Sequence, residues 1–430
     1  MFGCATARRL PVLLTVLGLV AACATGAGTS PSASVAPSPS ASVPGPTPAA
    51  PATASPTSTV VPTAPPQVGL AWQRVANPDL ISRSRDGRMY GVTAGGPGAI
   101  AWGSIYGAGP RIWTTVDGLD WRAASVEGAS DAEQGYPADV LDVTAGGPGY
   151  VAVGVYSRAG GDGQTSIVWT SVDGLTWQRI PFGPVFERSG MSQVVAWKGE
   201  ILAFGCENAS AADCGPGRVW ASPDGGTWTR ITPNLPEGLV SLRDDIAPAD
   251  DRLWGVGVSD PSGDMFSDYP RPPRVTSLDG RTWTTAPLPV LGIERLHPLP
   301  GGLYLTVEPS GDGPPAWVSR TPGVYRSTDL ATWEPLAVGH QLGLEIIAVG
   351  GTLIMVGAFD VSDARAWRST DGGRTWVAVQ AAGTPPAKVT SASMSSVAAL
   401  PNGTLVAVGA EQAGTQQSST AAWVSPPVRP

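Results

Sequence analysis

A short string recurs six times along the chain and constrains its fold more than any other feature. Each copy, called a box below, contains a Ser or Thr, an Asp, a Gly in all copies but one, and a closing Trp. The closing tryptophans are 43 to 56 residues apart, a period typical of an array of similar structural units. The aspartates and tryptophans of the six boxes are Asp117 and Trp121, Asp173 and Trp177, Asp224 and Trp228, Asp279 and Trp283, Asp329 and Trp333, and Asp371 and Trp376.

Each box lies between two predicted strands, because alternating apolar stretches such as residues 150–155 and 405–410 precede the boxes. In a tight turn an Asp can accept backbone N–H bonds, a Gly tolerates positive φ, and a Trp can cover the turn. These roles are structural, and no box aspartate differs in setting from the others. The fifth box has Leu330 in place of Gly, so we expect its turn to be looser.

The two ends of the repeat region complete each other. Residues 70–75 resemble the half unit that follows a box, and residues 422–425 resemble the half that precedes one, although Pro426 and Pro427 stand where an Asp is expected. Joined, the ends supply a seventh unit, and residues 68–430 then average about 52 residues per unit, enough for a four-stranded blade. We therefore expect an all-β, seven-bladed β-propeller of antiparallel blades, with the last blade closed by the N- and C-terminal strands.

The box strings resemble the Asp-box, or bacterial neuraminidase repeat (BNR), of β-propellers. Similar boxes occur in sialidases, sortilin-type receptors, glycoside hydrolases that process xyloglucan, and factors that assist photosystem II assembly. The resemblance covers residues 68–430 and implies a sialidase-like fold. It is specific for the fold and not for an activity.

The N-terminus reads as an export signal followed by a stalk. Arg8 and Arg9 precede an apolar stretch that ends at Ala22, as in a signal peptide, and residues 19–23 resemble the bacterial lipobox. The resemblance implies lipidation of Cys23, the alternative being an ordinary secretory signal. Residues 23–67 form an Ala/Pro/Ser/Thr-rich linker that is expected to be disordered. We expect an exported lipoprotein anchored to the bacterial membrane, with residues 68–430 facing the extracellular or periplasmic side.

Composition excludes several classes of function. Two histidines and four cysteines are too few for most zinc or redox-metal sites, so we expect no metal and no cofactor. A net charge of −8 argues against nucleic acid as a partner. Cys206 and Cys214 flank one predicted loop in an exported chain, which predicts a disulfide between them. We expect a monomer.

The strand order places the boxes and the glycine-rich turns on one face of the propeller, the box face. The variable loops and the connections between blades then lie on the other face, the loop face, where we expect any binding site. The two longest loops are residues 259–274 and 308–320. Their aromatic and arginine side chains are candidates for binding a glycan or a protein: Tyr269, Arg271, Arg274, Trp317 and Arg320.

Catalysis is the weaker interpretation, and no catalytic residue is assigned. The string Arg179-Ile180-Pro181 resembles a sialidase string, but it follows a box tryptophan and so belongs to the outer strand of the repeat. Acidic residues near the loop face could form a glycosidase pair, but nothing selects two of them; they are Asp244, Asp245, Glu294, Glu308, Asp312 and Glu345. Neither His297 nor His340 has a nucleophile motif around it. We therefore expect a non-catalytic binding or scaffold propeller, with a sialidase-like glycoside hydrolase as the alternative.

Overall fold

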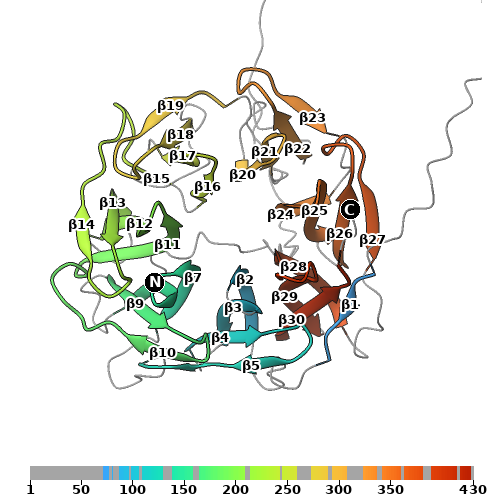
Figure 1. Cartoon of the computed structure of the whole chain (residues 1–430), viewed down its shortest axis with the longest axis horizontal. Coiled ribbons are helices and arrows are strands. Elements are labelled where there is room, and N and C mark those ends of the chain that lie inside the picture. Colours follow the sequence, from blue (N-terminus) through green and yellow to red (C-terminus); the bar gives the residue numbers. More distant parts are fainter. Residues whose placement is uncertain are drawn as a thin grey trace, which may run out of the picture. The chain divides into compact units, whose positions relative to one another are not determined.

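Seven small β-sheets surround a central axis in the part of the chain that the structure describes (Figure 1). Residues 1–67, including Cys23, lie outside the described residues. Within the described ranges no helix has the length and apolar character needed to cross a membrane. The computed structural model describes residues 71–76, 80, 87–95, 98–105, 109–128, 138–157, 164–208, 214–242, 245–258, 273–288, 293–307, 323–336, 341–359, 363–380, 389–413 and 417–427.

Each sheet is one blade, and in blades 1 to 6 the four main strands run in sequence order from the axis outward. The first three blades are β2 (Gly87–Gly95), β3 (Gly98–Ile105), β4 (Gly109–Thr115) and β5 (Trp121–Ala123); β7 (Asp139–Gly146), β8 (Gly149–Ser157), β9 (Gln164–Ser171) and β10 (Thr176–Arg179); and β11 (Ser189–Trp197), β12 (Glu200–Asn208), β13 (Cys214–Ser222) and β14 (Thr229–Ile231). A short strand, β6 (Ser125–Val126), joins blade 2 by pairing in parallel with β10.

Blades 4 to 6 follow the same order, although the inner strand of blade 4 is interrupted. They are β15 (Ser241–Leu242) and β16 (Ala247–Ala249), both paired with β17 (Arg252–Val258), then β18 (Arg274–Ser277) and β19 (Thr284–Ala286); β20 (Ile293–Leu299), β21 (Gly302–Val307), β22 (Gly323–Ser327) and β23 (Glu334–Leu336); and β24 (Gln341–Val349), β25 (Thr352–Phe359), β26 (Asp363–Ser369) and β27 (Val377–Gln380).

Blade 7 joins the two ends of the propeller, as the sequence predicts. It consists of β28 (Val389–Ala399), β29 (Leu405–Ala413) and β30 (Gln417–Ser425), with β1 (Gln73–Arg74) as the outer strand. Strand β1 pairs antiparallel with β30, placing Arg74 opposite Trp423. The Arg74 guanidinium donates through Nε and Nη2 to both carboxylate oxygens of Glu411 on β29, each at 2.6 Å. The Arg74 and Glu411 side chains are 14% and 3% exposed, so this ion pair closes the ring in a largely buried setting.

The hydrophobic core is divided among the seams between blades. Buried apolar residues form seven clusters in the described part of the chain, and each cluster draws its residues from two neighbouring blades. The seam between blades 7 and 1, for example, packs Met89 and Trp121 with Val406 and Val424. Burial of apolar surface between sheets is therefore what holds one blade against the next.

In the first five boxes the aspartate Oδ1 accepts the backbone N–H groups two and three residues further on, as the box residues predict, whereas the sixth box is one residue longer and Asp371 accepts the N–H of Thr375. In blade 2, Asp173 Oδ1 accepts the backbone N–H groups of Leu175 and Thr176 at 2.8 and 2.9 Å, and Trp177 Nε1 donates to the Gly174 carbonyl at 3.0 Å. The donors on Thr176 and Leu175 lower the pKa of Asp173. The box aspartates therefore act as structural acceptors.

The box turns also contact the preceding blade. Gly174 has φ of 76°, and a Cβ built on it would lie 2.4 Å from Ile100 Cδ1 of blade 1. Gly225 and Gly280 approach blades 2 and 3 in the same way. Leu330 replaces this glycine in the fifth box and adopts φ of 63°, a left-handed conformation, while Asp329 keeps its two backbone hydrogen bonds. That turn therefore retains the geometry of the others although its side chain is larger.

We predict that Gly174→Ala destabilises the protein. The new methyl group would clash with Ile100, and alanine disfavours the left-handed conformation, so the free energy of unfolding should fall by about 1–3 kcal/mol. Gly226→Ala is a matched control, because a Cβ there meets only Asp224 Oδ1, at 3.7 Å. Urea denaturation of both variants measures the difference, and equal stabilities would show that box turns do not lock the blades together.

The buried ion pair of blade 7 generates a second prediction. Glu411→Gln leaves the Arg74 charge largely buried without its carboxylate, so the free energy of unfolding should fall by about 3 kcal/mol. Glu334→Gln is the control, because Glu334 lies 3.7 Å from Arg374 and both side chains are more than half exposed. That change should alter stability by less than about 0.5 kcal/mol. Similar losses in the two variants would mean that Arg74 and Glu411 contribute little to ring closure.

Candidate functional site

Most of the residues expected to bind a ligand lie outside the described residues. These are Tyr269, Arg271, Trp317 and Arg320. Three of the acids considered for a glycosidase pair, Asp244, Glu308 and Asp312, also lie outside the described residues, as does His340. Arg274, expected in a loop, is instead the first residue of strand β18. Cys206 is disulfide-bonded. The side chain of Cys214 is not described, so its pairing with Cys206 stays a prediction.

Polar side chains of the inner strands form hydrogen bonds to neighbouring blades, and these side chains are called braces below. A β-bulge interrupts the pairing of six inner strands, for example between Val140 and Asp142. In four of these strands, the side chain of the residue after the bulge forms a hydrogen bond to the backbone of the next blade. Asp142 and Glu345 accept the backbone N–H groups of Val194 and Val397, both at 3.0 Å. The other two bonds join Gln193 to both backbone groups of Ile246, at 2.7 and 2.8 Å, and Ser396 Oγ to the Val92 N–H, at 3.2 Å.

These braces give structural roles to residues that could have been catalytic. Glu345, one of the candidate acids, braces blade 7 and also lies 3.4 Å from the Arg295 guanidinium. His297 lies in β20, where burial and the nearby Arg295 charge lower its pKa to about 3. The imidazole is therefore neutral at pH 7, and its Nε2 lies 3.4 Å from Thr306 Oγ1. Sequence reasoning missed the braces, although a polar residue recurs at this position in five blades.

One described carboxylate near the axis has a raised pKa. Asp139 is the first residue of β7, so it lies towards the loop face, and burial raises its pKa. Its charge in turn helps to raise the pKa of Tyr90, for which burial is the larger cause. The Tyr90 hydroxyl is hydrogen-bonded to Ser104 Oγ at 2.5 Å. Sequence reasoning overlooked both Asp139 and Tyr90.

Arg274 breaks the repeat at the seam between blades 4 and 5. It pairs with Val256, and the residue at this position of the third strand is buried and aliphatic in every other blade. The six counterparts are Ile112, Val168, Val219, Val324, Ala366 and Ala422. The Arg274 guanidinium lies 5.2 Å from the centre of the Trp254 ring, and Arg252 lies 5.9 Å from the same ring.

The guanidinium of Arg274 lacks a carboxylate partner among the described residues. Its Nε is buried and makes no hydrogen bond there. Burial, and secondarily the charge of Arg252, lower the pKa of Arg274. A half-buried cation with N–H donors that no described residue uses is therefore fixed at the start of β18.

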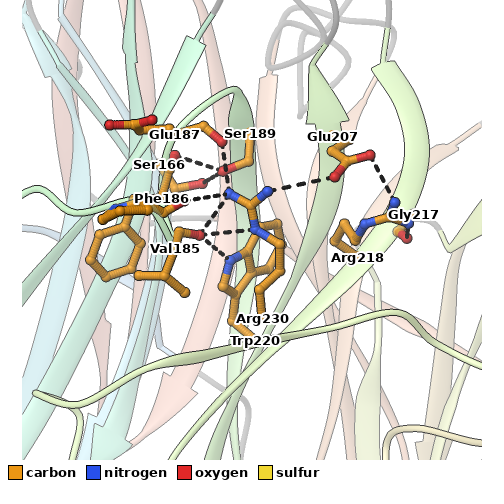
Figure 2. A network of polar contacts seen from close by, with 11 residues as sticks. Ser166, Val185, Phe186, Glu187, Ser189, Glu207, Gly217, Arg218, Trp220 and Arg230 are labelled. Carbon is orange, nitrogen blue, oxygen red and sulfur yellow. Dashed lines mark hydrogen bonds and ion pairs between the residues drawn. The ribbon is translucent and has the colours of Figure 1, made fainter.

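A second feature of the loop face is a connection held rigidly by Arg230 (Figure 2). Arg230 donates to the carbonyl oxygens of Val185 and Glu187, at 2.8 and 2.7 Å through Nη2, and lies 3.5 Å from the Glu207 carboxylate. The connection begins after Arg179, which ends outer strand β10, as the sequence predicts. It carries Phe182, 44% exposed, with the Arg179 guanidinium 4.9 Å from the ring centre.

Comparison with known proteins supports the fold alone. No protein-family model and no curated protein sequence matches the chain. A puromycin hydrolase structure is 15% identical with a TM-score of 0.50, covering 81% of this chain and 54% of that one. Trypanosoma rangeli sialidase is 12% identical with a TM-score of 0.46, covering 82% and 59%.

The match to a Dyadobacter fermentans protein of unknown function covers a larger share of that protein than the other two matches do of theirs. It is 10% identical with a TM-score of 0.45, and the match spans 84% of this chain and 98% of that one. The chain thus spans little more than half of the hydrolase and the sialidase. At these identities the likenesses carry no activity over to this protein.

Proposed function

We propose that this protein is an exported, non-catalytic Asp-box propeller that binds a glycan or protein ligand on its loop face. The observation that carries the proposal is Arg274, a half-buried cation that lies over the Trp254 ring and has no ion-pair partner among the described residues. The ligand we propose presents an acidic group to this guanidinium, since a bidentate anion satisfies its unused donors.

The location of Arg274 supports a binding role over a structural one. An aliphatic residue at this position would bury apolar surface, as it does in the other six blades, and would leave no unpaired donor. Departures from local regularity that bring no evident gain in stability are expected at functional sites. The same two blades depart from the repeat elsewhere, since the inner strand of blade 4 is interrupted and Leu330 of blade 5 has positive φ.

The N-terminal sequence supports a setting for this binding. Lipidation of Cys23 would anchor the chain to a bacterial membrane, and the linker of residues 23–67 would hold the propeller away from that surface. The membrane contact we propose runs through the lipid only. Candidate ligand contacts besides Arg274 are Tyr269, Arg271, Trp317 and Arg320.

The variant Arg274→Val tests the proposal through two opposite effects. Valine restores the residue type of the other blades, so the free energy of unfolding should rise by about 1–2 kcal/mol. Binding to the ligand should fall at least about tenfold because a charge-assisted contact is lost. Thermal unfolding measures the first effect. Retention of the protein on immobilised cell-wall glycans and on surface proteins measures the second.

Arg122→Val is the control, because Arg122 lies on outer strand β5 and its side chain is 67% exposed. It should change neither stability nor binding. Arg274→Val with unchanged binding refutes the proposed site. A loss of stability in that variant would show instead that Arg274 has a structural role.

The alternative function is a sialidase-like glycoside hydrolase, and Asp139 is the observation that favours it. Burial raises the pKa of the Asp139 carboxyl, and a carboxyl group that holds its proton more strongly is a candidate general acid. The purified protein should then release a fluorophore from sialoside or neutral glycoside reporters, and Asp139→Asn should abolish the release. No release from any reporter by the folded protein would exclude this alternative for those glycosides.

A further inference from the structure

A cavity of about 150 Å³ opens at the seam between blades 5 and 6, on the box face. It lies between the turn that joins β20 to β21 and the turn that joins β24 to β25. Its wall includes the box turn of blade 6 and two side chains of blade 5. The residues that matter for the argument are Gly301, Tyr304, Arg326, Gly350, Gly351 and Gly372.

Arg326 departs from the repeat at this seam. It lies on β22 opposite Tyr304, a position held by small or medium-sized residues in five blades and by Arg368 in blade 6. The five are Thr114, Thr170, Ala221, Thr276 and Val424. A long cation therefore replaces a short side chain where the cavity has formed.

The Arg326 guanidinium is fixed in place but has donors to spare. Its Nη2 donates to the Gly301 carbonyl at 2.7 Å, and the guanidinium lies 5.8 Å from the centre of the Tyr304 ring. Its Nε is buried without a hydrogen-bond partner, and no described carboxylate forms an ion pair with it. The guanidinium also hydrogen-bonds the Tyr304 side chain. Because a guanidinium has five N–H donors, part of its capacity remains unused.

Glycines keep the space beside this cation open. A Cβ built on Gly372 would lie 3.3 Å from Arg326 Nη1, whereas Cβ atoms on Gly350 and Gly351 would meet nothing within 4 Å. The Tyr304 hydroxyl donates to the Gly372 carbonyl at 3.1 Å, which fixes the box turn over the cavity. The volume is about five times the ~30 Å³ share of a water molecule in the liquid.

The acidic group nearest to this wall is already engaged. Asp371 of the same box accepts the Thr375 N–H at 2.9 Å and hydrogen bonds from the Ser369 and Thr375 hydroxyls. Arg374 adds a second positive charge and Asp371 a negative one, since both act electrostatically on the Tyr304 phenol together with Arg326. The cavity therefore presents a guanidinium that has no ion-pair partner in the described part of the chain, in a small space lined in part by four glycines.

We propose that this cavity is a second binding site, which takes a compact oxyanion such as a carboxylate, sulfate or phosphate group. The guanidinium fork matches two oxygens of such a group. The site lies on the face opposite to Arg274, so it does not depend on the proposed loop-face function.

Isothermal titration of the purified protein tests this site with three probes: sodium sulfate, inorganic phosphate and sodium glucuronate. Chloride at matched ionic strength is the reference. Saturable binding is expected for at least one probe, and Arg326→Gln should weaken it at least about tenfold. The probe that binds most tightly distinguishes a carboxylate ligand from a sulfate or phosphate ligand.

Two further variants keep the test decisive. Ala348→Val fills the cavity from strand β24 without removing the charge, and it should also weaken binding. Arg368→Gln removes the equivalent arginine of blade 6, which does not line the cavity, and should leave binding unchanged. Absence of saturable binding to all three probes overturns the proposal, as does equal affinity in the folded Arg326→Gln variant.

Discussion

The contact between each box turn and the preceding blade is the interaction on which the rest of the structure depends. A tight turn without a Cβ lets the backbone of one blade approach the second strand of its neighbour, as Gly174 approaches Ile100. The aspartate that fixes the turn uses its carboxylate on backbone N–H groups, which lowers its pKa and keeps it ionised. The most repeated acidic residue of the chain therefore serves architecture and is not available for chemistry.

The repeat provides seven versions of each position, so a departure can be recognised within one chain. Most seams bury aliphatic side chains where the blade 4–5 seam has Arg274. The blade 5–6 seam has Arg326 where most blades have a short side chain. Both arginines stack on an aromatic ring of the adjacent strand, Trp254 or Tyr304. Contact with an aromatic face offsets part of the free-energy cost of removing a guanidinium from water. It does not occupy the N–H donors in the plane of the guanidinium, which can bind an anion.

The number of blades and the mode of closure could be predicted because both depend on the repeat alone. Complementary halves at residues 70–75 and 422–425 require a shared sheet, and β1 pairs with β30 accordingly. The braces could not be predicted in this way, since a bulge shifts the alternation of an inner strand and makes Asp142 look like an ordinary surface acid. Arg274 was singled out as a loop residue, but its contact with Trp254 depends on strand register.

The net charge of −8 determines how anionic ligands can be recognised by this chain. Over long distances such a charge repels an anion, although salt at physiological strength screens charges beyond about 8 Å. Attraction must therefore come from groups in direct contact with the ligand. An arginine in a partly buried seam, without an ion-pair partner among the described residues, is such a group because low local polarity strengthens its hydrogen bonds. Recognition by Arg274 or Arg326 then depends on fit at the seam more than on electrostatic steering, so selectivity lies in the shape of each site.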